Sequence, residues 1–147
     1  MNRDALRTMW DQSWAEVTWV APWVKAIEGL TPEQAAWSPA PGRHSIWQIV
    51  NHVCFWREVT MTKLDPSRTS PRAEDAATLN FEPPAAITSG AWEQTRTRFK
   101  KSHDDLAAML SRPDASTERP AGHLVHDAYH LGQIMYLRAL QGLPKIE

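Results

Sequence analysis

The sequence predicts an all-α protein in which four long helices pack as a four-helix bundle. Apolar residues recur with a period near 3.6 in four segments, and capping signals, glycines and prolines mark the ends of most of them. No segment alternates apolar and polar β-forming residues, as a half-buried strand would. At 147 residues, the chain fits a single domain, residues 1–147, with one hydrophobic core.

The first long helix is predicted over residues 3–28. Its apolar face comprises Leu6, Met9, Trp10, Val17, Val20, Ala21, Val24 and Ile27. Pro22 lies inside this pattern and predicts a kink near residues 18–22, because proline cannot donate the helical hydrogen bond. Gly29 stands where a left-handed cap would end the helix.

A short extra helix and the second long helix follow. Residues 31–34 (Thr-Pro-Glu-Gln) have the form of a capping box with proline at the first helical position, which predicts the short helix. Ser45 and Gln48 form a second capping box, which opens a helix that runs to about residue 64. The stretch Asp65 to Pro84 is polar and contains four prolines, so we expect a loop that is long enough to be a functional feature.

Two further long helices complete the bundle. The third is predicted over residues 89–111, with Trp92, Phe99, Leu106 and Leu110 facing inward. The last starts near Pro120 and ends at Gly142, where glycine is followed by a proline two residues later. Consecutive antiparallel helices would run up, down, up and down.

Composition excludes several functional classes. The net charge is -1 and the 16 basic residues are scattered, so we expect no nucleic-acid partner. Cys54 is the single cysteine, which excludes an internal disulfide and suits a reducing compartment. No apolar run approaches the ~20 residues that cross a bilayer, and the first residues hold no signal-peptide core. These features predict a cytoplasmic protein without a membrane partner.

The chain contains eight tryptophans, many for its length. Core packing between helices is the simplest interpretation. Trp19 and Trp23 lie off the main apolar stripe of the first helix, so they are also candidates for a ligand pocket, a partner surface or a homodimer interface.

The main candidate for function is a set of three histidines. His126 and His130 are four residues apart, which places both imidazoles on one face of a helix and lets them share a metal ion. The third ligand must lie upstream, and His52 lies at a similar depth in its own helix. We therefore predict a divalent-metal centre with one coordination position open to water or substrate. Neutral imidazoles accept Zn²⁺, Ni²⁺, Mn²⁺ or Fe²⁺, and the alternative is that these histidines only make structural hydrogen bonds.

Other side chains are weaker candidates. His123 is expected beside the site or in solvent, His44 on the surface, His103 on the surface or between helices, and Cys54 in the core. No catalytic base stands out. The acidic residues that remain open for that role are Glu16, Glu58 and Asp127.

Two motifs resemble the DinB-like family of metalloenzymes. The first is the segment from Pro41 to His52, in which Ser45-Ile46 opens a helix that carries a histidine. The second runs from His126 to Ile134 and contains His-x-x-x-His followed by Gly-Gln-Ile. The presence of both motifs in this order makes the resemblance specific. With the order and lengths of the helices, it spans nearly the whole chain. The family often has Glu where this chain has Asp127, whose shorter side chain puts any role in orienting a ligand in doubt.

The resemblance implies a fold and a chemistry. The fold would be an up-down-down-up bundle, with a long crossover between the second and third helices, that binds a divalent metal through His52, His126 and His130. Characterised relatives include transferases of low-molecular-weight thiols such as bacillithiol or mycothiol, and a thiol-dependent maleylpyruvate isomerase. We therefore expect transfer of a low-molecular-weight thiol to a small-molecule electrophile. The alternatives are a metal-dependent hydrolase, a non-catalytic protein that binds metal or a small ligand, and an interaction module.

Overall fold

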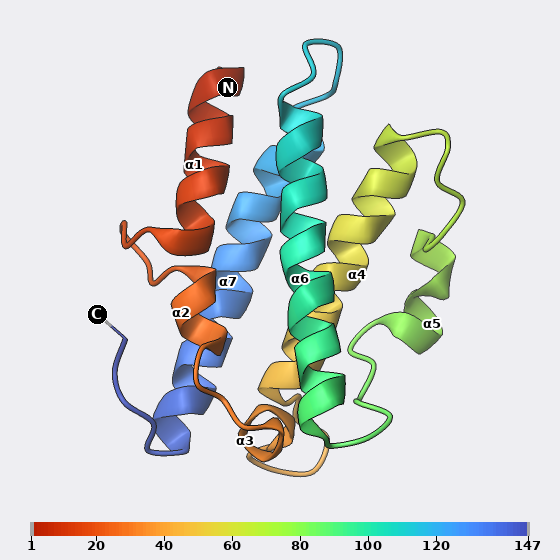
Figure 1. Ribbon diagram of the computed structural model, residues 1–147. Helices are drawn as coiled ribbons and strands as arrows, with labels where there is room; N and C mark the ends of the chain where they lie inside the picture. Colours follow the sequence, from red (N-terminus) through yellow and green to blue (C-terminus); the bar gives the residue numbers. More distant parts are fainter. Residues whose placement is uncertain (1, 147) are drawn as a thin grey trace.

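The computed structural model describes residues 2–146, and within these residues the protein contains helices and no strand, which confirms the all-α prediction. The four long helices are α1 (Arg3–Ala15), α4 (Ile46–Leu64), α6 (Ser89–Leu110) and α7 (Glu118–Leu140). The short ones are α2 (Trp23–Ile27), α3 (Pro32–Ala36), the 3-10 turn η1 (Ala73–Asp75) and α5 (Ala76–Leu79). Figure 1 shows the long helices side by side, with α5 to one side of α4.

The directions of the helices follow from contacts between them. In Figure 1, α1 and α7 run one way while α4 and α6 run the other. The indole of Trp47, near the start of α4, donates to Thr95 near the start of α6 (2.8 Å). By contrast, His123 near the start of α7 is bonded to Thr60 near the end of α4 (2.8 Å). The chain between α4 and α6 therefore returns along the length of the bundle.

Local signals position the start of α4 as predicted. The side chain of Ser45 accepts from the backbone N–H of Gln48, and the side chain of Gln48 accepts from the backbone N–H of Ser45. Thr31 and Gln34 form the equivalent capping box at α3. Since the Ser45 cap fixes the first residue of α4, it also fixes the level of His52, almost two turns into the helix.

The core holds a charged residue at its centre. The largest cluster of buried apolar residues joins α2, α3, α4, α6 and α7, and a second cluster joins α1 to the ends of α4 and α6. Arg57 of α4 is fully buried, and its guanidinium lies 5.0 Å from the ring centroid of Trp10 and 4.8 Å from that of Phe99. Aromatic faces stabilise a cation in this position, but a buried charge also needs an ionic partner.

The first predicted helix is wrong as a single helix. The chain leaves α1 after Ala15 and starts α2 at Trp23, so residues 16–22 form a break rather than a kink. Pro22 is extended (φ -74°, ψ 152°) and stands as the residue before α2, a position at which its missing N–H costs nothing. Gly29 has the predicted left-handed conformation (φ 70°).

Two other expectations need correction. The stretch Asp65 to Pro84 is not loop throughout, because it contains η1 and α5. Trp23 is 2% exposed and packs edge-on against Phe99, so it is a core residue, whereas Trp19 is fully exposed. Both tryptophans nevertheless line one cleft of about 440 Å³, as the pocket interpretation expects. The break after α1 separates the two tryptophans into different segments, which a single helix would not do.

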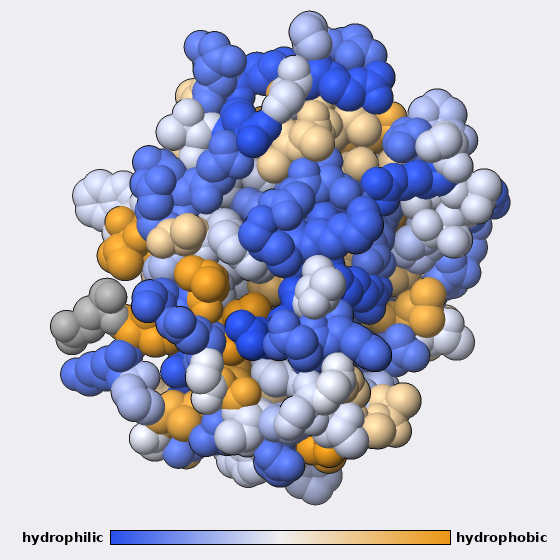
Figure 2. Space-filling view, in the orientation of Figure 1, coloured by the Kyte–Doolittle hydropathy of each residue, from blue (hydrophilic) through white to orange (hydrophobic). Residues whose placement is uncertain are grey.

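The outer surface is mixed in character. Figure 2 shows hydrophilic residues over most of the upper half of one face and hydrophobic residues more often in its lower left, where α2 lies in Figure 1. Among residues 2–146, no helix has the length and hydropathy of a membrane span.

Candidate metal centre

The structure brings the three predicted histidines together. His52 Nε2 and His126 Nε2 are 3.0 Å apart. The ring centroid of His130 lies 4.3 Å from that of His52 and 4.5 Å from that of His126. One ring nitrogen of each histidine lies within 4.8 Å of the others. This histidine cluster is compatible with metal binding.

Antiparallel packing of α4 and α7 produces this convergence. His126 and His130 are one turn apart on the side of α7 that faces α4. His52 points from α4 toward both of them. His52 and His130 are each 6% exposed, whereas 32% of the His126 side chain is exposed, so the cluster opens to solvent beside His126.

The second ring nitrogen of each histidine is engaged by a side-chain oxygen. His126 Nδ1 donates to Asp127 Oδ1 (3.0 Å), and His130 Nδ1 donates to Gln133 Oε1 (2.8 Å). His52 Nδ1 donates to Asn80 Oδ1. When Nδ1 carries the proton of a neutral imidazole, Nε2 carries the lone pair. In this form the lone pairs of His52 and His126 lie on the Nε2 atoms that face each other, and the bond to Gln133 leaves Nε2 as the free nitrogen of His130.

Electrostatics keeps two of these rings neutral at pH 7. Burial, together with the nearby imidazoles of His130 and His126, lowers the pKa of His52 to about 4, against the hydrogen bond to Asn80, which raises it. Burial is also the main cause that lowers the pKa of His130. A neutral imidazole is the form that binds a metal.

Asp127 is ionised for a different reason. Burial raises the pKa of its carboxyl, but the charge of Arg57, the nearby imidazole of His123 and the hydrogen bond from His126 outweigh burial and hold the pKa below its ordinary range. An ionised carboxylate only accepts hydrogen bonds, so the Nδ1 of His126 must donate to it.

This arrangement fits a divalent cation. Two lone pairs facing each other at 3.0 Å repel unless a cation lies between them. In a tetrahedral zinc site with Zn–N bonds of about 2.0–2.1 Å, two ligand nitrogens lie about 3.3 Å apart, close to the observed distance. Three neutral nitrogens leave one of four positions for water or substrate.

A buried ion pair connects the cluster to the core. The Nε and Nη2 of Arg57 donate to Asp127 Oδ2 at 2.9 and 2.6 Å, and the two side chains are 0% and 5% exposed. The other oxygen of Asp127 holds His126. The aspartate therefore reaches both partners in spite of its short side chain. The sequence did not identify Arg57 as part of the site. Its position, four residues after Val53, places it on the inward face of the helix, and a buried arginine there indicates a buried acidic partner.

The crossover between α4 and α6 also contributes to the site. Asn80 holds His52, and the ring of Phe81 stacks on the ring of His52 with centroids 3.9 Å apart. Gln48 and Asn51 of α4 donate to the backbone oxygens of Phe81 and Glu82, at 3.1 and 2.7 Å, and so fix this part of the crossover. The sequence indicated a functional segment here but did not identify these residues.

The other candidate histidines take separate places. His123 is buried beside the cluster, where it is bonded to Thr60 and its Nδ1 lies 3.7 Å from Asp127 Oδ1. His44 is exposed, as predicted, and stacks on Phe81 (3.9 Å). His103 is buried between helices and stacks on an indole of α1.

Two of the three candidate bases are committed to arginines. Arg98 donates to both oxygens of Glu58 at 2.7 and 2.6 Å. Asp127 is bound by Arg57, whereas Glu16 is exposed on the break after α1. Cys54 is fully buried, and burial raises the pKa of its thiol to about 12, as expected of a core cysteine.

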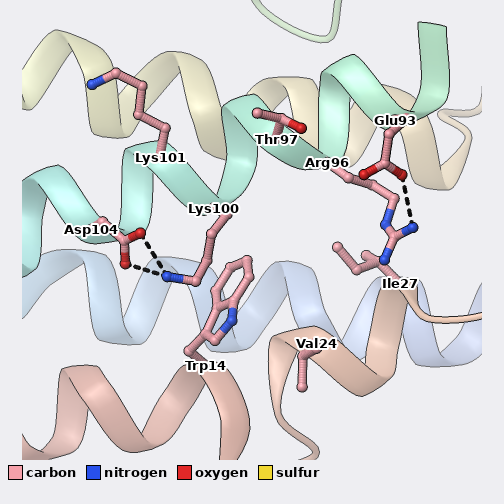
Figure 3. Close-up of a pocket in the computed structure, with 9 residues that line it drawn as sticks. All are labelled: Trp14, Val24, Ile27, Glu93, Arg96, Thr97, Lys100, Lys101 and Asp104. Atoms are coloured by element: carbon pink, nitrogen blue, oxygen red, sulfur yellow. Dashed lines mark hydrogen bonds and ion pairs between the residues drawn. The ribbon is translucent and has the colours of Figure 1, made fainter. Parts of the chain in front are cut away.

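One sizeable cleft lies away from the histidine cluster. A cleft of about 530 Å³ separates α6 from α1 and α2, and Figure 3 shows the side chains that line it. Two of its charge pairs lie within the lining, since Lys100 pairs with Asp104 (2.6 Å) and Arg96 with Glu93 (3.0 Å). The ammonium of Lys100 also lies 5.3 Å from the ring centroid of Trp14. None of the clustered histidines lines this cleft.

Comparison with known proteins identifies the family. The sequence model of the DinB superfamily matches residues 10–134, a range that includes the three clustered histidines and Arg57, Asn80 and Asp127. No curated protein and no solved structure matches the chain. The match covers most of the 147 residues. The chain belongs to the DinB superfamily.

Proposed function

We propose that this protein is an up-down-down-up four-helix bundle that binds one divalent metal ion through His52, His126 and His130 and activates a thiol. The observation that carries the proposal is the convergence of three Nε2 lone pairs whose Nδ1 partners are all in place. The donor set suits Zn²⁺, Ni²⁺, Mn²⁺ or Fe²⁺.

The chain's own residues orient the three ligands. Asn80, Asp127 and Gln133 each fix the tautomer and the plane of one imidazole. When bound, the metal supplies a Lewis acid that lowers the pKa of a coordinated thiol or water. Phe81 shields one face of His52 from water. The partial exposure of His126 leaves a route by which a small molecule can reach the histidine cluster.

The proposed reaction is the transfer of a low-molecular-weight thiol to a small-molecule electrophile. Superfamily membership and the open position of a three-histidine centre support it. A thiol whose pKa is lowered by a bound metal would release its proton to solvent at neutral pH and would then need no separate base to attack an electrophile. This is consistent with a site in which Glu58 and Asp127 are both committed to arginines.

The test is thiol consumption by the metal-loaded protein. A panel of bacillithiol, mycothiol and glutathione is combined with a panel of small electrophiles, and remaining thiol is measured over time. We expect one combination to react well above background in the wild type and at background after chelation or in His52→Ala. Background rates throughout the panel would contradict thiol transfer. Metal-dependent hydrolysis of ester or amide substrates without thiol would favour the hydrolase alternative.

A further inference from the structure

A second cleft adjoins the histidine cluster. It has a volume of about 420 Å³ and lies between the second half of α4 and the first turns of α7. It is lined by Trp56, Thr60, Arg119, Gly122, His123 and His126. His126 belongs both to this cleft and to the histidine cluster, and it is the most exposed of the three clustered histidines. A molecule that occupies the cleft therefore reaches the open side of the cluster.

The charge in this cleft is positive. Arg119 lines it and, among residues 2–146, has no carboxylate within 4.0 Å. Glu118 precedes it but does not line the cleft. The hydroxyl of Thr60 and the Nε2 of His123 satisfy each other, so they add no charge that would neutralise Arg119. An exposed guanidinium beside a cleft is a ready partner for a carboxylate.

The walls of the cleft differ in character. Trp56 is half-buried and offers an apolar aromatic surface, held by edge contacts to Phe55 and His52. Gly122 has no side chain, and a Cβ added there would meet no atom within 4 Å. The cleft therefore has open space between an indole on one side and bare backbone on the other.

The length of the ligand follows from helix geometry. Arg119 and His126 are seven residues apart on α7, which corresponds to about 10 Å along the helix axis. A molecule about 10 Å long would match this separation between the backbone positions of the two residues.

We propose that the cleft is a subsite for a carboxylate-bearing thiol. The carboxylate pairs with Arg119, the middle of the molecule lies along Trp56, and the thiol reaches the histidine cluster. This inference rests on the proposed function, because it places the thiol at the metal. It adds the recognition of an anionic group about two helical turns from the reacting sulfur.

The test compares two thiols of equal length on the cobalt-loaded protein. The probes are 8-mercaptooctanoate and its neutral counterpart 8-mercaptooctan-1-ol, and binding is followed by the change in cobalt absorption. We expect the carboxylate to bind about fivefold more tightly, an advantage that falls when NaCl is raised. In Arg119→Gln the two affinities should become equal. Arg112→Gln is the matched control, because Arg112 is exposed and already paired with Asp114 (2.9 Å).

A space-filling variant tests the position of the middle segment. Gly122→Leu should weaken both thiols without changing cobalt content, because its side chain would extend into the cleft from a position where an added Cβ meets no other atom within 4 Å. Equal binding of the two thiols to the wild type, or a carboxylate preference that survives in Arg119→Gln, would overturn the subsite.

A metal-free arm separates this subsite from the proposed function. Octanoate is titrated into chelated protein while the indole N–H signal of Trp56 is followed by NMR. A shift of this signal in the wild type that is absent in Arg119→Gln supports the subsite. If, in addition, neither thiol changes the cobalt spectrum, that second result contradicts only the binding of the thiol at the metal. No shift in the wild type contradicts the subsite, even if the metal binds.

Discussion

The ion pair between Arg57 and Asp127 gives a quantitative test of how the site is anchored. Both Arg57 donors reach one carboxylate oxygen, at 2.9 and 2.6 Å, and both side chains are almost fully buried. The perturbation is a double-mutant cycle with Arg57→Met, Asp127→Asn and the double variant. Methionine retains most of the volume of the arginine side chain, and asparagine retains the shape of the aspartate, so the cycle isolates charge from packing.

The expected magnitude follows from burial. Removing one partner leaves the other charge buried without compensation, which costs about 3–5 kcal/mol. For a chain of this length that corresponds to a fall in Tm of about 10–15 °C. The double variant leaves no unpaired charge, so it should lose less than the sum of the single variants, with a coupling of about 2 kcal/mol or more.

The assay is urea denaturation at pH 7 in the presence of chelator, so that metal binding does not contribute. At this pH the carboxyl of Asp127 is ionised in the folded and unfolded chains. Because its folded pKa is lowered, the pair contributes its full stabilisation above about pH 4 and loses it as pH falls through the folded pKa. Single variants that each lose less than about 1 kcal/mol, or effects that simply add, would refute the reasoning.

Three further predictions concern other parts of the fold. Burial, with the charges of Arg57 and Lys100, lowers the pKa of His103 to about 3. As pH falls below about 6.5, the histidine therefore takes up a proton in the unfolded chain but not in the folded chain. His103→Phe should therefore flatten the loss of unfolding free energy between pH 7 and pH 4 by up to about 1.4 kcal/mol per pH unit, and an unchanged slope would contradict this. In chelator competition, Asn80→Ala should weaken metal binding about tenfold while the nearby exposed Thr78→Ala matches the wild type. In urea denaturation, Trp23→Ala should lower the free energy of unfolding by about 3–5 kcal/mol, because this indole is buried. Trp19→Ala should change it by less than about 0.5 kcal/mol, because this indole is exposed.

Local chemistry explains what could be predicted from the sequence. The capping boxes at Thr31 and Ser45 depend only on residues three apart, so they place the starts of α3 and α4 correctly. The spacing of His126 and His130 is equally local. Adding His52 required a non-local argument from depth in the bundle, and the structure brings all three together.

Long-range partners explain what could not be predicted. Arg57 and Asp127 are 70 residues apart, and no local pattern links them. Asn80 lies in a polar, proline-rich crossover whose path has no periodicity, so its contact with His52 depends on how η1 and α5 fold back along α4.

Periodicity also concealed the break after α1. Apolar residues continue at helical spacing through Val17 and Val20, yet Pro22 cannot donate a hydrogen bond into that helix and the two valines are disfavoured in helices by their branched side chains. A pattern of hydrophobicity reports which residues face inward but not whether the backbone bonds between them exist. The homodimer predicted from the tryptophans stays a prediction, and of the two that suggested it, Trp19 is exposed and Trp23 is buried.

Metal content measured on untagged protein tests the central claim most directly. Inductively coupled plasma mass spectrometry is applied to the wild type, His52→Ala, His126→Ala and His130→Ala, with the exposed His44→Ala as the matched control. The three-histidine centre predicts close to one divalent metal per chain in the wild type and the control, and loss of the metal in each of the other three variants. Substoichiometric metal in the wild type, or metal that is retained in these three variants, would contradict a metal centre at these histidines.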